Sequence, residues 1–271
     1  MKIKRAKGHG LHATFSVDLS EKDSSWHVKL RPAKDHARMI DEAMRTRWAH
    51  TRFPIPTPDR ARVMRLPGVS ALITETIEGT PSHQCIETLE PHVILRGLSS
   101  AITSIRNIGT LGCIFKPPHW TTEQGIEENL KNLQNSKTKR KDLHPDFADL
   151  TFRELKDIAD IGDDGQKAVS HGDLCMPNVL IDDKGNPAGI VDLGELHIGS
   201  PNLDLAIMSW VVQANMGNRW AHHLLAAHGA DSQEPVILHN RLAYDLGLER
   251  PGPWEWVQAP QLHEQRERLA G

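Results

Sequence analysis

The stretch AVSHGDLCMPNVLIDDKGNPAGIVDLG, residues 168–194, contains the pattern that decides the fold. Within it, two mainly apolar runs at 178–181 and 189–193 flank an Asp-Lys-Gly-Asn turn. A turn of this composition between apolar runs predicts that the two strands pair as a β-hairpin. The hairpin would bring Asn178, at the start of one strand, close to Asp192, at the end of the other.

The same stretch carries a third polar side chain that suits the chemistry of this pair. Asp173 precedes Asn178 by five residues and lies on the loop before the hairpin. An Asn carbonyl and an Asp carboxylate are ligands that suit Mg²⁺, which keeps several waters and bridges nucleotide phosphates. A further carboxylate can accept the proton of an attacking hydroxyl. We therefore predict a phosphoryl-transfer site in which Asp173 is the catalytic base and Asn178 and Asp192 hold magnesium.

A plainer interpretation treats these three residues as turn-forming polar side chains that cap strands. It accounts for each of them singly but not for their joint spacing. His-Gly-Asp is followed by four residues and Asn, then by thirteen residues and Asp-Leu-Gly, and this combination is far more specific than a lone His-Gly-Asp.

The spacing resembles the protein-kinase catalytic loop and its metal-binding Asp-x-Gly. His-Gly-Asp at 171–173 stands in place of His-Arg-Asp, and Asp-Leu-Gly at 192–194 in place of Asp-Phe-Gly. This form resembles the aminoglycoside phosphotransferase family, most closely the 3′- and 3″-phosphotransferases, and Asp204-Leu-Ala matches a further segment of that family. The resemblance implies ATP or GTP as co-substrate with Mg²⁺. It also implies that His171 and Asp204 support the catalytic loop without taking part in the chemistry.

In the N-terminal part, the resemblance extends to four nucleotide-binding residues. Lys29, inside an apolar strand, resembles the lysine that contacts the nucleotide phosphates, and Glu42 on the next helix resembles its ion-pair partner. Glu75 and Ile77 would belong to the hinge whose backbone contacts the adenine. A lone strand lysine can also be a solvated edge charge. With these residues the resemblance covers about residues 10–246.

The expected fold class is α+β, in a two-lobed protein-kinase-like arrangement. We expect a small N-terminal antiparallel sheet with one helix, and a larger, mainly helical C-terminal lobe that contains the hairpin. A Gly-Thr-Pro segment at 79–81 marks the boundary, so residues 1–79 would form the nucleotide-binding lobe and 80–271 the catalytic and substrate-binding lobe. The predicted strands lie within 3–18 and at 26–30, 61–65 and 69–76, and the predicted helices at 35–51, 89–108, 123–133, 147–161, 202–228 and 233–246.

Composition limits where the protein works and what it binds. No run of eighteen apolar residues occurs, and the basic start is not followed by an apolar segment, which predicts neither a membrane span nor a signal peptide. The three cysteines form no CxxC pair, so we expect a reducing, cytoplasmic location. The basic run at 137–141 lacks interleaved aromatics, and we interpret it as a solvated loop, with no nucleic-acid partner.

Charge is divided between the two parts of the chain. Residues 1–79 carry 15 Lys and Arg against 9 Asp and Glu, whereas the remainder carries 17 against 26. An acidic second part suits a small cationic substrate, and the resemblance implies an aminoglycoside. Glu195 and Asp245 are the candidate substrate-binding residues, although both could be plain surface carboxylates. Glu195 stands where the family usually has Arg, so the substrate follows less directly than the chemistry.

Three functions remain open from the sequence. The first is phosphorylation of an aminoglycoside hydroxyl, which would confer antibiotic resistance. The second is a kinase of the same fold that acts on another small metabolite, such as a choline-, homoserine- or fructosamine-like compound, or on a macrolide. The third is a nucleotide-binding pseudokinase that serves as a regulatory module.

Overall fold

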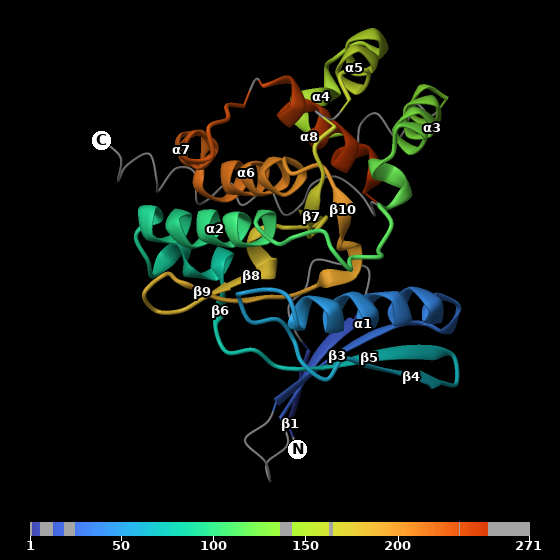
Figure 1. Ribbon diagram of the computed structural model, residues 1–271, viewed down its shortest axis with the longest axis vertical. Coiled ribbons are helices and arrows are strands. Elements are labelled where there is room, and N and C mark those ends of the chain that lie inside the picture. The colour runs from blue at the N-terminus through green and yellow to red at the C-terminus, as the bar shows by residue number, and fades with distance from the viewer. Residues whose placement is uncertain are drawn as a thin grey trace.

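The computed structural model describes residues 2–5, 13–18, 25–135, 143–162, 165–232 and 234–248. Two lobes are stacked along the long axis of the molecule (Figure 1). One lobe holds a five-stranded sheet and one long helix, and the other holds most of the helices. The predicted α+β, two-lobed architecture is therefore confirmed.

The sheet of the first lobe is antiparallel throughout, with strand order β1-β2-β3-β5-β4. Its strands are β1 Lys2–Arg5, β2 Ala13–Asp18, β3 Ser25–Pro32, β4 Arg62–Leu66 and β5 Val69–Glu75. A glycine-containing turn, which the sequence Lys-Gly-His-Gly predicts at residues 7–10, lies outside the described residues. Each observed strand overlaps a predicted one, because alternating apolar residues between polar turns specify half-buried strands.

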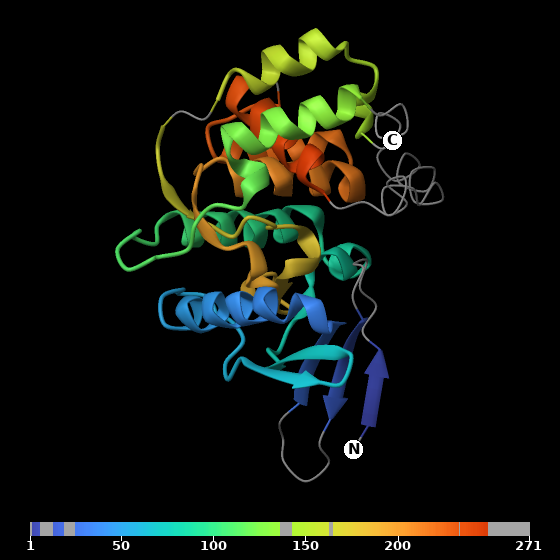
Figure 2. The ribbon, with the colours of Figure 1, turned by 90° about the vertical axis from the view of Figure 1, so that its right-hand side faces the viewer.

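Helix α1, His36–His50, lies across the sheet on the side that faces the other lobe (Figure 2). Its Met39 and Ala43 pack with Leu72 of β5, and Leu72 is the cross-strand partner of Lys29 on β3. Cross-strand partners share one face of a sheet, and strand residues two apart do so as well. Lys29 and Arg31 are therefore both on the face turned toward α1.

The chain enters the second lobe beside the predicted hairpin. Strand β6, Thr80–Pro81, pairs with β8, Val179–Ile181, which pairs in turn with β9, Pro187–Ile190. The hairpin is confirmed, but the predicted return strand at 189–193 is displaced: β9 ends at Ile190. Asp192 adopts a left-handed backbone conformation, with φ 62° and ψ 58°, which Asp tolerates better than most residues.

A further strand pair, which the sequence did not predict, lies before the His-Gly-Asp loop and after Asp-Leu-Gly. Strand β7, Ala168–Ser170, leads into the His-Gly-Asp loop and pairs with β10, His197–Gly199, which follows Asp-Leu-Gly. The two segments of the motif are thus tied together at both ends.

The second lobe is built on a helical core. Leu98, Ile102 and Ile105 of α2 belong to the same buried cluster as Ala206 and Met208 of α6. The helices are α2 Pro91–Arg106, α3 Glu123–Gln134, α4 Pro145–Ala148, α5 Phe152–Ala159, α6 Leu203–Met216, α7 Asn218–Ala227 and α8 Pro235–Gly247. The chain also contains short 3₁₀ helices: η1 Ala33–Asp35, η2 Ser82–Glu87, η3 His119–Thr121, η5 Met176–Asn178 and η6 Leu193–Glu195. Among the described residues, none of these helices has the length and apolar character to cross a bilayer.

Two long predicted helices are wrong because local signals divide them. The helix predicted at 147–161 is α4 and α5, since Thr151 and Glu154 form a capping box that begins a new helix. The helix predicted at 202–228 is α6 and α7, separated by Gly217, whose φ of 95° is incompatible with a continuous helix.

Candidate active site

Asp204 holds the backbone of the His-Gly-Asp loop. Its carboxylate accepts the N–H of His171 at 2.8 Å and the N–H of Gly172 at 3.0 Å. Asp204 is buried in the first turn of α6, where the helix dipole favours a negative charge. Gly172 has a φ of 82°, and a Cβ there would come within 2.4 Å of the carbonyl oxygen of Glu195. The loop conformation therefore requires both the aspartate and the glycine.

His171 links the loop to the segment before Asp192. Its Nδ1 accepts the backbone N–H of Asp173 at 3.2 Å, and its Nε2 lies 3.0 Å from the carbonyl oxygen of Val191. The tautomer with the proton on Nε2 satisfies both contacts. His171 thus fixes the position of Asp173 relative to Val191, and hence relative to the next residue, Asp192.

Asp173 and Asn178 lie together at the mouth of this loop. The amide Nδ2 of Asn178 donates to the carbonyl oxygen of Asp173 at 2.9 Å and lies 3.5 Å from its Oδ2. The other carboxylate oxygen, Oδ1, accepts the hydroxyl of Tyr244 at 2.6 Å. Burial and the neighbouring charge of Asp192 raise the pKa of Asp173 to about 6. A carboxylate with such a pKa is a better proton acceptor than an ordinary aspartate.

Lys29 joins the two lobes at the same place. Its Nζ lies 2.9 Å from Oε1 of Glu42 on α1 and 2.8 Å from Oδ1 of Asp192. Burial alone would lower the pKa of Lys29, but Asp192 and Glu42 together raise it above its ordinary value. The charge of Lys29 in turn lowers the pKa of Asp192 to about 2. Both lysine and aspartate are therefore charged at neutral pH.

Arg31 adds a second cation, which the sequence pattern did not indicate. It lies two residues beyond Lys29 on the same face of β3 and is 8% exposed. Its Nε is buried and makes no hydrogen bond to any described residue. Burial and the nearby charge of Arg38 lower the pKa of Arg31, while the carboxylates of Glu42 and Asp192 act in the opposite direction.

The donor set fits a magnesium ion held jointly with a nucleotide. The amide nitrogen of Asn178 is directed at Asp173, which leaves its carbonyl oxygen as a ligand. Lys29 contacts Oδ1 of Asp192, which leaves Oδ2. No group of three or more His, Cys, Asp or Glu side chains in the described ranges could hold a metal without help. Mg²⁺ needs only one or two protein oxygens when phosphates and water supply the rest.

The hinge residues lie where the lobes join. Glu75 ends β5, and its N–H donates to the carbonyl oxygen of Asp59 at 3.2 Å. The next residue, Thr76, donates its N–H to the carbonyl oxygen of Ser25 at 2.9 Å. Ile77 follows in the connection to β6. These two bonds anchor the end of β5 to the segments that precede β4 and begin β3.

The two predicted substrate-binding carboxylates lie in different surroundings. Oε1 of Glu195 accepts a hydrogen bond from Arg38 of α1 at 3.0 Å, which forms an ion pair between the lobes. Asp245 is 2% exposed, and its Oδ2 accepts the backbone N–H of His144 at 2.9 Å. The interpretation of Asp245 as a surface carboxylate is therefore wrong. These contacts do not bring Asp245 to Asp173, whereas its neighbour Tyr244 contacts Asp173 directly.

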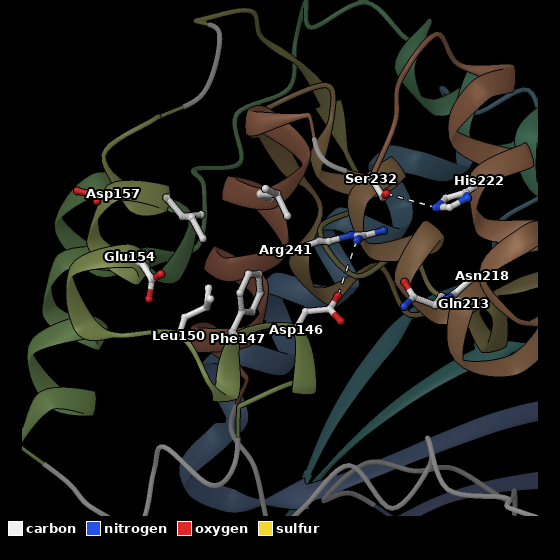
Figure 3. A pocket seen from close by; sticks show the side chains of 12 residues that line it. Asp146, Phe147, Leu150, Glu154, Asp157, Gln213, Asn218, His222, Ser232 and Arg241 are labelled. Atoms are coloured by element: carbon white, nitrogen blue, oxygen red, sulfur yellow. Dashed lines mark hydrogen bonds and ion pairs between the residues drawn. The ribbon is translucent and has the colours of Figure 1, made fainter.

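A cavity of about 620 Å³ lies elsewhere in the second lobe, between α4–α5 and α6–α8 (Figure 3). Its wall includes three carboxylates, of Asp146, Glu154 and Asp157, together with Arg241. Arg241 donates to Ser209 at 2.8 Å and lies 3.9 Å from Asp146. None of the predicted site residues lines this cavity, so it is separate from the cluster around Asp173.

A family profile described as the phosphotransferase enzyme family (APH) matches residues 2–239. The chain belongs to this family. One curated relative is an aminoglycoside 3′-phosphotransferase of Streptomyces fradiae, which is 22% identical to this chain over 216 residues. The aligned region covers 75% of this chain and 78% of the relative. An aminoglycoside 3′-phosphotransferase of Escherichia coli is 23% identical to this chain over 214 residues, and the aligned region covers 78% of this chain and 75% of that relative.

Solved structures share the fold of this phosphotransferase. The aminoglycoside phosphotransferase APH(3″)-Id of Streptomyces rimosus, solved with ADP and streptomycin, aligns with a TM-score of 0.66 at 22% identity over 90% of this chain and 92% of that one. A macrolide 2′-phosphotransferase of Brachybacterium faecium aligns with a TM-score of 0.58 at 14% identity, over 89% and 82%. The predicted kinase-like fold and the family resemblance are confirmed.

Proposed function

We propose that this phosphotransferase moves the γ-phosphate of a nucleoside triphosphate onto a hydroxyl of a cationic aminoglycoside. The observation that carries the proposal is the convergence of Asp173, Asn178 and Asp192 beside the Lys29–Glu42 pair, at the junction of the lobes. Curated relatives that are aminoglycoside 3′-phosphotransferases support the acceptor class. The neighbouring structure of an aminoglycoside phosphotransferase with ADP and streptomycin supports both substrates.

In this proposal, residues 1–79 bind the nucleotide and residues 80–271 carry the catalytic and substrate-binding groups. The backbone at Glu75 and Ile77 contacts the base, and Lys29, held by Glu42, contacts the phosphates. Asn178 and Asp192 hold Mg²⁺, which neutralises phosphate charge when it is bound. His171 and Asp204 keep the catalytic loop in place through the bonds described above.

The step itself requires positioning more than covalent chemistry. The acceptor hydroxyl donates its hydrogen bond to the Asp173 carboxylate, its oxygen attacks the γ-phosphorus, and the bond from that phosphorus to the nucleotide's bridging oxygen breaks. Asp173 takes the proton and the nucleoside diphosphate leaves. Lys29 and Arg31 lie on one face of β3, where their charges would stabilise the negative charge on the phosphate oxygens.

The acceptor is the less constrained part of the proposal. The acidic balance of residues 80–271 favours a polycation such as an aminoglycoside. Glu195 remains a candidate for binding it, although Glu195 would first have to exchange its ion pair with Arg38. The macrolide phosphotransferase among the structural neighbours keeps the alternative open, in which the acceptor is a macrolide or another small metabolite.

A coupled assay of ADP release, run with aminoglycosides, macrolides and hydroxyl-bearing metabolites, tests the acceptor. We expect turnover with at least one aminoglycoside and a phosphorylated product by mass spectrometry. Turnover only with a macrolide or a metabolite would replace the aminoglycoside by the alternative. Nucleotide binding without turnover on any acceptor would favour a pseudokinase.

The pH dependence of the reaction tests the base. Asp173 must be ionised to accept a proton, and its pKa is raised to about 6. We therefore expect kcat/KM for the nucleotide to fall as the pH drops through about 6, because this parameter reports the ionisation of the free enzyme. A profile that stays flat down to about pH 4.5 would mean an ordinary aspartate pKa and would contradict the raised pKa of Asp173.

The remaining expectations concern location and partners. Cys85, Cys113 and Cys175 are free thiols, which supports a reducing compartment. Because the reaction consumes a nucleoside triphosphate, we propose that the protein acts in the cytoplasm on a small molecule. We propose no nucleic-acid or membrane partner.

A further inference from the structure

Tyr244 makes the shortest side-chain contact to the proposed catalytic base. Its hydroxyl donates to Oδ1 of Asp173 at 2.6 Å, across 71 positions of sequence. It is the only tyrosine of the chain. A short hydrogen bond from a hydroxyl to a carboxylate is stronger and more directional than one between neutral groups.

Tyr244 is itself held from a second side. Trp120 of η3 meets the Tyr244 ring edge to face, with ring centroids 5.8 Å apart. Trp120 also lies against Gly247 of α8, where a Cβ would come within 2.5 Å of the Trp120 Cγ. The glycine lets the indole approach the helix, so η3 and the end of α8 fix the tyrosine ring together. Two elements from different parts of the chain therefore determine where the hydroxyl points.

The contacts of the Asp173 carboxylate explain why a fixed position of the Tyr244 hydroxyl matters. On its other side, Asn178 bonds the Asp173 main-chain carbonyl well, at 2.9 Å, but Oδ2 only at 3.5 Å. A distance of 3.5 Å is too long for a strong hydrogen bond. Within the described part of the chain, Tyr244 thus makes the one short side-chain hydrogen bond to this carboxylate.

We propose that Tyr244 is a positioning residue that orients the Asp173 carboxylate so that Oδ2 faces the acceptor hydroxyl. An ionised carboxylate has lone pairs enough for both the tyrosine and the substrate, so the two contacts are compatible. The proposal rests on the proposed function, because it acts through Asp173 as the base. It adds a residue from the last described helix to a site otherwise built from β3, α1 and the hairpin.

Replacement of Tyr244 by Phe removes the hydroxyl and leaves the ring against Trp120. We expect kcat to fall about 10- to 100-fold, because a small misplacement of a catalytic group lowers the rate by this order. The KM values for nucleotide and acceptor should stay within about twofold of the wild type. The decisive comparison is a double-mutant cycle. If Tyr244 acts through Asp173, then Tyr244→Phe should slow Asp173→Ala no further, because groups that act as a unit are not additive.

Two further measurements separate this role from others. Gly247→Ala should push Trp120 away and lower kcat in the same direction as Tyr244→Phe, with the hydroxyl still present. A crystal structure of Tyr244→Phe should show the Asp173 carboxylate rotated or in more than one orientation, which can be seen even if no acceptor is known.

Several outcomes would overturn the proposal. Full kcat in Tyr244→Phe, an equal further loss in the double variant, or an unchanged Asp173 carboxylate in the crystal would each do so. Phosphate found on Tyr244 by mass spectrometry after incubation with ATP would assign it instead as an acceptor. Absence of turnover by the wild-type enzyme on every acceptor would count against the proposed function, and the crystal comparison would still decide the role of Tyr244.

Discussion

Asp173→Ala should abolish phosphoryl transfer while nucleotide binding persists. Removal of a general base costs about 10²- to 10⁴-fold in rate, so we expect kcat to fall by about 1000-fold. The nucleotide is expected to bind through Lys29 and the hinge, which Asp173 does not contact in the described hydrogen bonds. Turnover by a coupled ADP-release assay and affinity by calorimetry measure the two effects separately.

Replacement of Asp173 by Asn should not weaken folding. The pKa of Asp173 is raised to about 6 in the folded protein, so its ionised form is less favourable there than in the unfolded chain. Stability is therefore lost as the pH rises from about 4 to about 6, and the cost persists at neutral pH. Asp173→Asn, which keeps an oxygen for Tyr244, should melt no lower than the wild type at pH 7.5.

A matched control comes from the same hairpin. Asp183 lies exposed in the turn at its far end, so Asp183→Asn removes an equivalent charge without touching the site. We expect it to retain full kcat. Normal turnover by Asp173→Ala would end the assignment of the base, and equal losses in both variants would point to damage of the hairpin.

Lys29→Met should damage both stability and activity. Lys29 is 16% exposed and lies between the carboxylates of Glu42 and Asp192. Its removal leaves these two charges facing each other without a cation, and loss of one partner of a buried pair costs about 3 kcal/mol. Urea denaturation should therefore show a lower free energy of unfolding, and KM for the nucleotide should rise because the phosphates lose their cation.

A second substitution separates the two effects. Lys29→Met combined with Glu42→Gln removes the uncompensated charge on α1, so it should recover much of the stability and none of the activity. Lys34→Met removes an exposed lysine from η1 and should change neither. An unchanged KM for nucleotide in Lys29→Met would contradict the role of this lysine in phosphate binding.

The sequence predicted well those features that local pattern encodes. The hairpin between Asn178 and Asp192 follows from a polar turn between apolar runs, and it is present. The strands of the first lobe and α1 follow from periods of two and of three to four residues. Failures were local as well: the capping box at Thr151 and the glycine at 217 divided helices that apolar spacing alone had joined.

The candidate site also has residues that the sequence selected and contacts that only the structure shows. The resemblance paired Lys29 with Glu42, and the hairpin motif selected Asp192 separately. The structure joins all three through contacts of 2.8 and 2.9 Å. Asp245 was selected, and its neighbour Tyr244 is the residue that meets Asp173. The single tyrosine was a possible signal in the sequence, but nothing in the spacing of α8 indicated which side of the helix would face the loop.

The sequence by itself therefore predicted the fold class, the hairpin and the side chains that we propose for phosphoryl transfer. Only the tertiary structure decided which of them meet, and it brought in Arg31 and Tyr244. The reason is physical: turns and strand alternation depend on neighbours in the chain, and they leave a pattern within a few residues. A contact across 71 or 163 positions depends on how whole helices and lobes pack, and no short stretch of sequence records that packing.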